Sequence, residues 1–243
     1  KKYNIEENYK YRDIKLMKNI FPSSILVIAA HPDDEILMAG GTMARNFKEG
    51  GTNSVIFMTN GVGSREEGNF NSDFNIRALE AEKANNTLGS SIIKSYDFPD
   101  NALDNVSLLS LIKTIENHID IIKPDIIITH SQDELNIDHQ LVGRAVITAN
   151  RPKNGRKNIL LLLGDIPSSC EWSISNWKQK NNLYIDIENF KDLKYEAMRC
   201  YKSECREPPN PRAIELLKSR DCLIGSEAGL NCAESFYIQR ITL

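Results

Sequence analysis

The sequence predicts an α/β protein with a Rossmann-like, mostly parallel sheet, helices on both faces and a C-terminal elaboration. Three observations predict this fold. Short apolar runs alternate with longer stretches of helical periodicity, as in strand–helix–strand units. The short runs are almost continuously apolar, which is typical of strands buried on both faces. Polar clusters follow the strands, where open α/β sheets place their chemistry.

Each element follows from its local pattern. Residues 25–30 predict the first strand, and residues 35–48 predict a helix whose Gly40 and Gly41 allow a close approach to the sheet. Further strands are expected at 54–59, 92–98, 125–129 and 159–163, with helices at 73–88, 106–122 and 138–149 between them. The buried face of the helix at 73–88 is expected to carry Ile76, Leu79, Ala84 and Leu88.

After Pro167 the pattern becomes less regular. Strands are expected at 183–187 and 233–240, and helices at 188–205 and 211–220. The proline-rich break at 208–211 separates two helices and does not resemble a domain linker. We therefore expect one domain over residues 1–243, with a core at about 22–165 and a C-terminal elaboration at about 166–243.

Composition excludes several classes of protein. The hydrophobic fraction is 41% and the net charge is −3, so the chain has no overall basic character that would favour a nucleic-acid partner. It contains no apolar run of about 20 residues, and hence no transmembrane segment is expected. The first twenty residues are charged and polar, unlike a secretory signal. Five cysteines without a C-x-x-C pair favour reduced, mostly buried thiols and a cytoplasmic location.

The most informative motif directly follows the first predicted strand. Residues 31–35 read His-Pro-Asp-Asp-Glu, and buried carboxylates are costly unless they are paired or bind a metal. The fourth strand is followed by Asp138 and His139. Because the carboxyl ends of parallel strands share one edge, these groups are expected to converge.

This convergence predicts a metal centre. His31, Asp34 and His139 supply two imidazoles and a carboxylate, the ligand type of catalytic zinc sites. Asp33 is free to act as general base toward a water molecule activated by the metal. Zn²⁺ is expected, although another divalent transition metal such as iron(II), cobalt or manganese suits the same ligands.

Each motif also has a simpler interpretation. The acids at 33–34 can cap a helix, and Asp138 can cap a second helix beside an incidental histidine. Asp138 can instead orient a ligand histidine. Arg65 can bind a phosphate or sugar hydroxyls, or remain a solvated loop charge. Asp100 can accept from sugar hydroxyls or form an Asx turn.

The same residues resemble the LmbE-like / PIG-L superfamily of zinc-dependent N-deacetylases. The resemblance covers roughly residues 25–150. It rests on the segment 29–35, on 59–61 with Arg65, and on 129–130 followed by Asn-Ile-Asp-His at 136–139. It implies zinc held by His31, Asp34 and His139, with Asp33 as general base. It also implies that Arg65 and Asp100 contact a sugar. From its position at the end of a predicted strand, His130 can contact the substrate or support a ligand, or it can be a satisfied structural histidine.

One position departs from the family pattern. Many members carry a histidine three residues before the third ligand, whereas this chain has Asn136. An amide can donate to an oxyanion but cannot deliver a proton at neutral pH. Asp33 after protonation, or His130, can replace that histidine as the acid. The departure also leaves room for an altered substrate or reduced activity.

The resulting hypothesis is a hydrolase that removes the N-acetyl group from an N-acetylhexosamine-containing small molecule or conjugate. The expected partner is this amino-sugar substrate, and a homo-oligomer is possible. The alternatives are hydrolysis of another acyl amide and a non-catalytic, Rossmann-like metal- or ligand-binding protein. A nucleotide-cofactor enzyme is disfavoured because no G-x-G-x-x-G follows the first strand.

Overall fold

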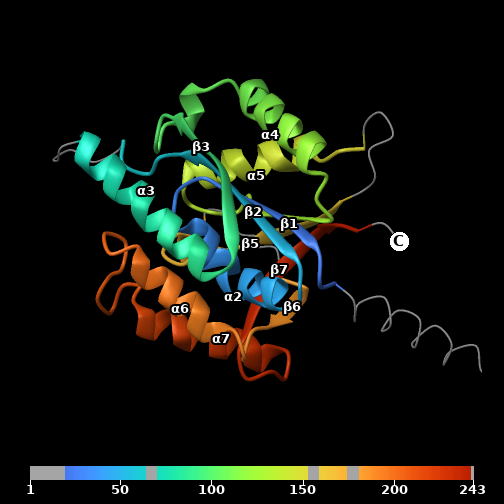
Figure 1. Ribbon diagram of the computed structural model, residues 1–243, viewed down its shortest axis with the longest axis vertical. Helices are drawn as coiled ribbons and strands as arrows, with labels where there is room; N and C mark the ends of the chain where they lie inside the picture. Colours follow the sequence, from blue (N-terminus) through green and yellow to red (C-terminus); the bar gives the residue numbers. More distant parts are fainter. Residues whose placement is uncertain (1–19, 64–69, 153–158, 174–180, 242–243) are drawn as a thin grey trace, which may run out of the picture.

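Seven strands form a single sheet in the part of the chain that the computed structural model describes, residues 20–63, 70–152, 159–173 and 181–241. The strand order is β3-β2-β1-β4-β5-β7-β6 (Figure 1). The strands are β1 (Ser24–Ala29), β2 (Thr52–Thr59), β3 (Ser90–Phe98), β4 (Ile126–His130), β5 (Leu160–Gly164), β6 (Leu183–Asp186) and β7 (Ala233–Arg240). All seven lie where the apolar runs predict strands, with shifts of one or two residues at their ends.

The sheet is parallel from β3 to β5, and its order reverses between β1 and β4. From β1 the chain builds β2 and β3 toward one edge, then returns to place β4 and β5 on the other side of β1. The last two strands are added antiparallel, because β7 pairs with β5 and with β6 in that sense. At such a reversal, here between the carboxyl ends of β1 and β4, open α/β sheets bind their ligands in a crevice.

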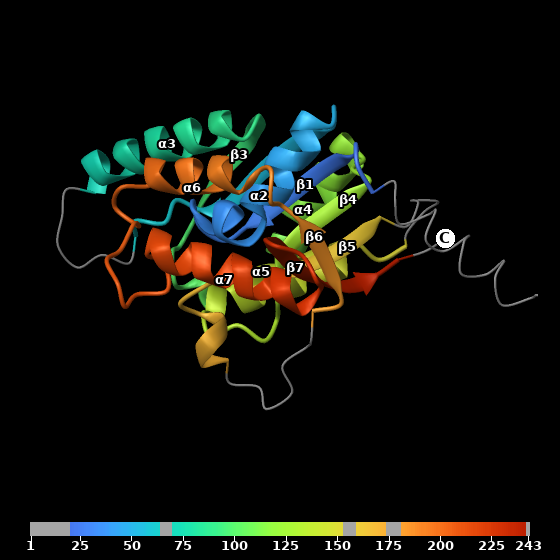
Figure 2. The same cartoon turned by 90° about the horizontal axis from the view of Figure 1, so that it is seen from below.

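Helices cover both faces of the sheet. One face carries α2 (Asp34–Lys48), α3 (Phe70–Thr87), α6 (Lys191–Cys200) and α7 (Ile214–Glu227). The opposite face carries α4 (Leu108–Ile122) and α5 (Ile137–Ala149), and two short 3-10 helices lie at Leu103–Asn105 and Cys170–Trp172. Figures 1 and 2 show the two helical layers with the sheet between them. The Rossmann-like, mostly parallel fold expected from the sequence is confirmed.

The core consists of two apolar clusters, one on each face of the sheet. Alternate residues of β1 point to opposite faces, so Val27 belongs to one cluster and Ile28 to the other. The face predicted for α3 is partly wrong. Ala84 and Leu88 are buried, but Ile76 and Leu79 are about half exposed, at 51% and 54%. The buried side chains of the helix include those of Arg77, Glu80, Ala81, Ala84 and Asn85, so polar groups share its inward face.

The C-terminal helices differ from the sequence-based boundaries. The helix predicted at 188–205 is shorter, because it ends at Cys200, and the helix predicted at 211–220 runs instead from Ile214 to Glu227. Residues 201–213 form turns that include the proline-rich segment, since proline lacks the N–H that a continuing helix needs. Figure 2 shows this connection on the same side of the molecule as the start of α3.

The two glycines of α2 allow a close approach, but its partner is the C-terminal part of the chain. A Cβ atom at Gly41 would lie 2.7 Å from Ile187, and one at Gly40 would lie 3.0 Å from Lys194. The elaboration is therefore packed directly on α2. Because α2 begins at Asp34, this packing reaches the helix that carries the acidic motif.

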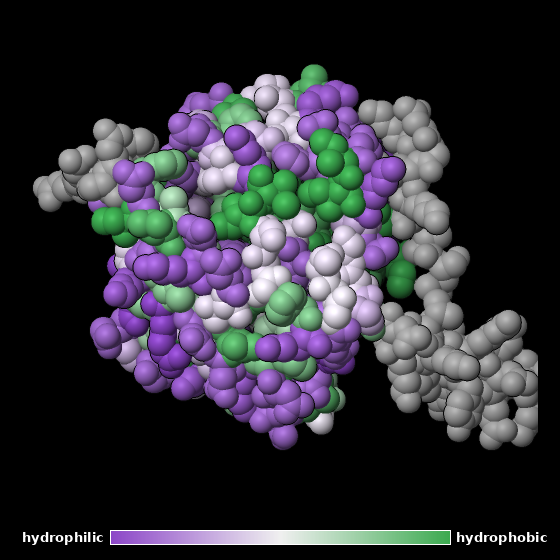
Figure 3. Space-filling view, viewed as in Figure 1, coloured by the Kyte–Doolittle hydropathy of each residue, from purple (hydrophilic) through white to green (hydrophobic). Residues whose placement is uncertain are grey.

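On the face shown in Figure 3, hydrophilic side chains lie mainly around the outside, and a hydrophobic patch lies near the middle. Exposed hydrophobic side chains include Ile93 of β3 and Ile121 of α4. Among the described residues, no helix has the length and apolar character needed to cross a membrane. All five cysteines are free thiols, as expected. Two of them, Cys170 and Cys232, are buried, whereas Cys222 is exposed, so the thiols are less buried than predicted.

A buried ion cluster joins the elaboration to the core. Lys194 of α6 is 2% exposed, and its Nζ lies 2.9 Å from both Asp221 Oδ1 and Glu234 Oε1. Glu234 also accepts the backbone N–H groups of Gly41 (2.9 Å) and Thr42 (2.7 Å) inside α2. Burial opposes the charged form of Lys194, but the two carboxylates raise its pKa above the usual value.

Removing this lysine should destabilise the fold strongly. Lys194→Ala would leave two buried carboxylates without their cation, which typically costs about 3–5 kcal/mol of unfolding free energy. Urea denaturation of the wild type and the variant measures this difference. The control is Lys191→Ala on the same helix, where a surface pair with Glu188 is lost and little change is expected. Equal effects of the two substitutions would contradict the assignment.

Candidate metal centre and active site

The turn after β1 holds its acidic residues in an unusual backbone conformation. Asp33 has a φ of 118° and a ψ of −29°, which residues other than glycine rarely adopt. The Asp33 N–H donates to Glu35 Oε2 (2.9 Å), and Arg77 Nη1 donates to the Pro32 carbonyl (3.4 Å). The Asp33 side chain makes no capping hydrogen bond to α2. Helix capping therefore does not explain this acid, and backbone strain of this kind is typical of functional sites.

Asp34 is fully buried at the centre of a cluster of imidazole rings. Its Oδ2 lies 3.2 Å from His31 Nδ1 and 3.3 Å from His139 Nε2. His130 Nε2 is slightly farther, at 3.5 Å. Burial by itself would raise the pKa of Asp34, but the neighbouring imidazoles, His139 above all, hold it well below its usual value. The cluster therefore favours an ionised carboxylate surrounded by positive charge.

Two further acids hold His31 from its other side. Its Nε2 lies 3.1 Å from Asp100 Oδ1 and 3.2 Å from Asp138 Oδ2. Burial opposes the charged form of His31, but the hydrogen bonds to these acids and to Asp34 raise its pKa well above 6.5. Asp138 is itself fixed, because its carboxylate accepts the N–H groups of residues 101 (2.7 Å) and 103 (3.0 Å). This support orients the ring and leaves Nδ1 toward Asp34.

His139 is positioned by two residues that precede it. Asn136 is the N-cap of α5, and its Oδ1 accepts the N–H groups of Asp138 (2.8 Å) and His139 (3.4 Å). Glu134 Oε2 lies 3.4 Å from His139 Nδ1, while Glu134 Oε1 accepts the Ile166 N–H (2.7 Å). The cap of this helix is thus Asn136 and not Asp138. These contacts turn the other ring nitrogen, Nε2, toward the acid cluster.

His130 lies behind this cluster. It ends β4, is completely buried, and accepts the Ala30 N–H at Nε2 (2.8 Å). Its ring stacks on His139, with centroids 4.2 Å apart and planes 8° apart. Burial, together with the nearby charge of His139, lowers the pKa of His130 well below the usual value. The ring is therefore neutral and supports His139 from the interior.

The residues present fit a divalent metal. Ligand atoms of His31, Asp34 and His139 all lie within 4.8 Å of one another. Asp34 Oδ1 and His139 Nε2 are among the buried atoms that lack a hydrogen-bond partner in the described part of the chain. Buried polar atoms are normally paired, and a cation would satisfy both. Two imidazoles and one carboxylate match catalytic zinc sites, which keep one coordination position open.

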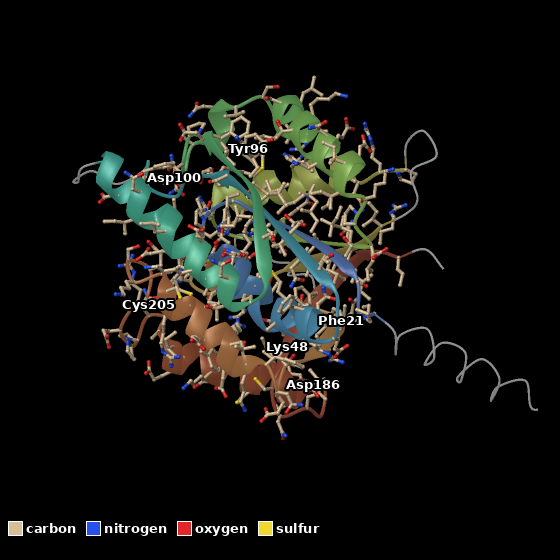
Figure 4. The ribbon with its side chains drawn as sticks, viewed as in Figure 1. Phe21, Lys48, Tyr96, Asp100, Asp186 and Cys205 are labelled. Atoms are coloured by element: carbon tan, nitrogen blue, oxygen red, sulfur yellow. The ribbon has the colours of Figure 1, made fainter. Side chains whose placement is uncertain are left out.

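A second group of possible ligands is less suited to a metal. His31, Asp100 and Asp138 are equally close to one another. However, both carboxylate oxygens of Asp138 already accept backbone N–H groups, as described above. This group therefore orients the first one. Asp100, labelled in Figure 4, follows β3 and reaches the site from the edge of the sheet.

Asp33 lies beside the cluster of His31, Asp34 and His139, and its side chain contacts the guanidinium of Arg212. Its side chain is nearly fully buried, and Oδ2 accepts a hydrogen bond from Arg212 Nη1 (2.8 Å). Burial raises the pKa of Asp33 to about 6, although Arg212 acts in the opposite direction. Burial likewise raises the pKa of Glu35 to about 8, although Tyr201 donates to its Oε1 (2.6 Å) and thereby lowers it. A carboxylate with a raised pKa beside a metal position suits proton transfer.

The structure brings together most residues singled out in the sequence. His31, Asp34 and His139 meet, with Asp33, Asp100, Asp138 and His130 around them. Asn136 is near but uses its carboxamide as a helix cap and as a donor to Asn101 Oδ1 (3.0 Å). Arg65 lies outside the described residues.

Two contributors were not singled out in the sequence. Glu134 supports His139, and Arg212 contacts Asp33. Glu35 belonged to the motif at 31–35, and the structure shows that it supports the strained turn. Glu134 carried a weak signal, because it is an acid in a polar loop after a strand. Arg212 carried none, since it lies in an irregular segment far along the chain.

Comparison with known proteins agrees with the fold. Among solved structures, the conserved protein TT1542 from Thermus thermophilus superposes with a TM-score of 0.73 at 22% identity, over 91% of this chain and 96% of that one. The N,N'-diacetylchitobiose deacetylase from Pyrococcus horikoshii superposes with a TM-score of 0.71 at 20% identity, over 98% of this chain and 94% of that one. GalB, the 4-carboxy-2-hydroxymuconate hydratase from Pseudomonas putida, superposes with a TM-score of 0.69 at 20% identity, over 90% of this chain and 98% of that one.

At these identities the structural similarities establish the shared fold and not a shared reaction. The sequence match is more specific. The family model described as PIG-L, GlcNAc-PI de-N-acetylase, matches residues 26–150, which are 125 of the 243 residues and contain most of β1, the acidic motif, β4 and all of α5. The chain belongs to the PIG-L family.

Proposed function

We propose that this protein is a metal-dependent hydrolase that removes an N-acetyl group from an N-acetylhexosamine-containing sugar or sugar conjugate. The observation that carries the proposal is the buried cluster of His31, Asp34 and His139 beside Asp33. It occurs in a member of a family whose model is named for de-N-acetylation of a glucosamine conjugate. A similar structure is that of a chitobiose deacetylase, which supports a sugar substrate.

In this proposal His31, Asp34 and His139 hold the cation, either Zn²⁺ or another divalent transition metal. When bound, the cation polarises the amide carbonyl and lowers the pKa of water to about 7. The protein contributes the orientation of its ligands. Asp100 and Asp138 hold His31, whereas Glu134 and His130 hold His139.

Asp33 takes the proton from the attacking water and returns it to the leaving amine. Its position beside the ligands and its raised pKa support both steps. Asn136 does not supply this proton, because an amide has no acidic proton and its oxygen is engaged by the helix N-terminus. His130 is equally unsuited, since its ring is buried behind His139.

Substrate contacts are assigned from position. Asp100 lies at the edge where β3 ends, so its carboxylate can also accept from sugar hydroxyls. Arg65 is proposed to bind the same sugar. We further infer that the core and the C-terminal elaboration act as one unit, because β7 pairs with β5 of the core.

Acetate release from a panel of N-acetylated sugars tests the proposal. The wild type loaded with Zn²⁺ should release acetate from at least one N-acetylglucosamine conjugate, and chelation should abolish the activity. N-formyl and longer N-acyl derivatives in the same panel separate a deacetylase from a hydrolase of other amides. Because GalB shares the fold as a hydratase, an unsaturated hydroxy acid is included. Reaction with that acid and none of the amides would contradict the proposal.

Two substitutions separate metal binding from proton transfer. His139→Ala should lose bound zinc and activity together, because it removes a ligand. Asp33→Asn should retain zinc but lower kcat by about 10²–10⁴-fold, the usual contribution of a general base. Zinc is measured by elemental analysis and kcat by acetate release. Full activity in both variants would exclude this assignment of roles.

The assignment of Asn136 as a helix cap has its own test. Asn136→Ala should lower the free energy of unfolding by about 1 kcal/mol, because two N–H groups of α5 lose their acceptor. Asn136→Asp is the matched variant that keeps the cap, and its kcat should stay within a few-fold of the wild type. Urea denaturation and acetate release provide the two readouts. A large loss of kcat in a stable Asn136→Asp protein would show that the amide contacts the reacting substrate.

A further inference from the structure

The direction of the Asp33 carboxylate is set by a contact from outside the core. Asp33 follows a strained turn, and its side chain is 2% exposed. Its Oδ2 accepts from Arg212 Nη1 at 2.8 Å. A buried carboxylate without a partner would turn or take up a proton. The contact with Arg212 therefore bears directly on where the carboxylate points.

The guanidinium of Arg212 is itself held in place. Its Nε donates to Ser168 Oγ (2.9 Å), and its Nη1 also donates to Glu204 Oε2 (3.2 Å). The other oxygen of Glu204 accepts from Arg77 Nη2. Because Arg77 also binds the carbonyl of Pro32, the network returns to the turn that carries Asp33.

These contacts come from segments that the fold brings to one edge. Arg212 and Glu204 belong to the connection between α6 and α7, and Ser168 follows β5. Figure 4 labels Cys205, next to Glu204, on the same side of the molecule as Asp100. A planar guanidinium with several N–H donors can bridge a hydroxyl and two carboxylates in one orientation, which a lysine ammonium cannot reproduce.

We propose that Arg212 is a positioning residue for Asp33, supplied by the C-terminal elaboration to complete the active site. The inference rests on the proposed function, in which Asp33 transfers the proton. Its physical basis is the bridge from Ser168 and Glu204 through Arg212 to Asp33 Oδ2. Arg212 itself need not touch the substrate. Without it, the acid remains present but loses its fixed direction relative to the metal ligands.

Two other roles give different kinetic signatures. If Arg212 only joined the elaboration to the core, its removal would lower stability and leave kcat nearly unchanged. If it bound the substrate, its removal would raise KM with little change in kcat. The positioning role predicts a loss in kcat, because a misplacement near 1 Å at a reacting group can cost about 10²-fold.

The experiment compares Arg212→Ala, Arg212→Lys and the control Arg220→Ala. Arg220 of α7 forms a similar ion pair with Glu171 (2.8 Å), and that pair does not involve Asp33. We expect Arg212→Ala to lose about 10- to 100-fold in kcat, with KM and zinc content close to wild type. Arg212→Lys should recover part of that loss, and Arg220→Ala should retain full kcat.

Guanidinium rescue supplies a readout that a purely structural role would not move. Guanidinium chloride, far below denaturing concentrations, should restore part of kcat in Arg212→Ala and none in Asp33→Asn. If Arg212→Ala keeps the wild-type kcat, guanidinium has nothing to restore and the inference is overturned. A rise in KM without a loss of kcat would overturn it as well. So would an equal loss of kcat in Arg220→Ala.

A structural readout keeps this test separate from the proposed function. Crystal structures of the wild type and Arg212→Ala should show the Asp33 carboxylate turned away from its wild-type direction in the variant. An unchanged carboxylate would overturn the inference even if the enzyme is a deacetylase. Conversely, a wild type that deacetylates no sugar would overturn the proposed function, while the crystal structures would still decide whether Arg212 positions Asp33.

Discussion

The fully buried carboxylate of Asp34 is the constraint on which the site depends. An ionised acid without solvent must be compensated, and here the imidazoles of His31 and His139 contact it. Compensation requires the end of β1 and the start of α5, which follows β4, to approach one point. The parallel sheet provides that approach, because its order reverses between β1 and β4 and both strands end at the same edge. The buried cluster of His31, Asp34 and His139 and the topology are therefore two aspects of one arrangement.

The side chains around this centre are held by hydrogen bonds, and Asp33 is held in a strained backbone conformation. The residues at the metal position are supported by acids that are themselves bound to backbone N–H groups, so the rings cannot rotate freely. The acid beside the metal position, Asp33, lies on a strained turn held by Glu35. A second buried ion cluster around Lys194 joins α6, α7 and β7 to α2. The elaboration is thus coupled to the helix that begins at the site.

Fold and reaction are not equivalent in this group of structures. A deacetylase and a hydratase superpose on this chain with nearly equal scores, so the reaction depends on the side chains at the crevice. The substitution of Asn136 for the usual histidine is one such difference. In the proposed function proton transfer falls to Asp33, and this is why the contact between Asp33 and Arg212 matters for the proposed chemistry.

Local pattern alone determined the strands, the central helices and the polar residues that end each strand. The spacing of hydrophobic residues and the positions of turn-forming residues act over only a few residues of chain. From these, the convergence of His31, Asp34 and His139 could be predicted, since strand order in a parallel sheet brings carboxyl ends together. The inward face of α3 and the contact of Arg212 with Asp33 could not be predicted in this way. Only the tertiary structure decided them, because they depend on which distant segments pack against each other, and that information is absent from local sequence.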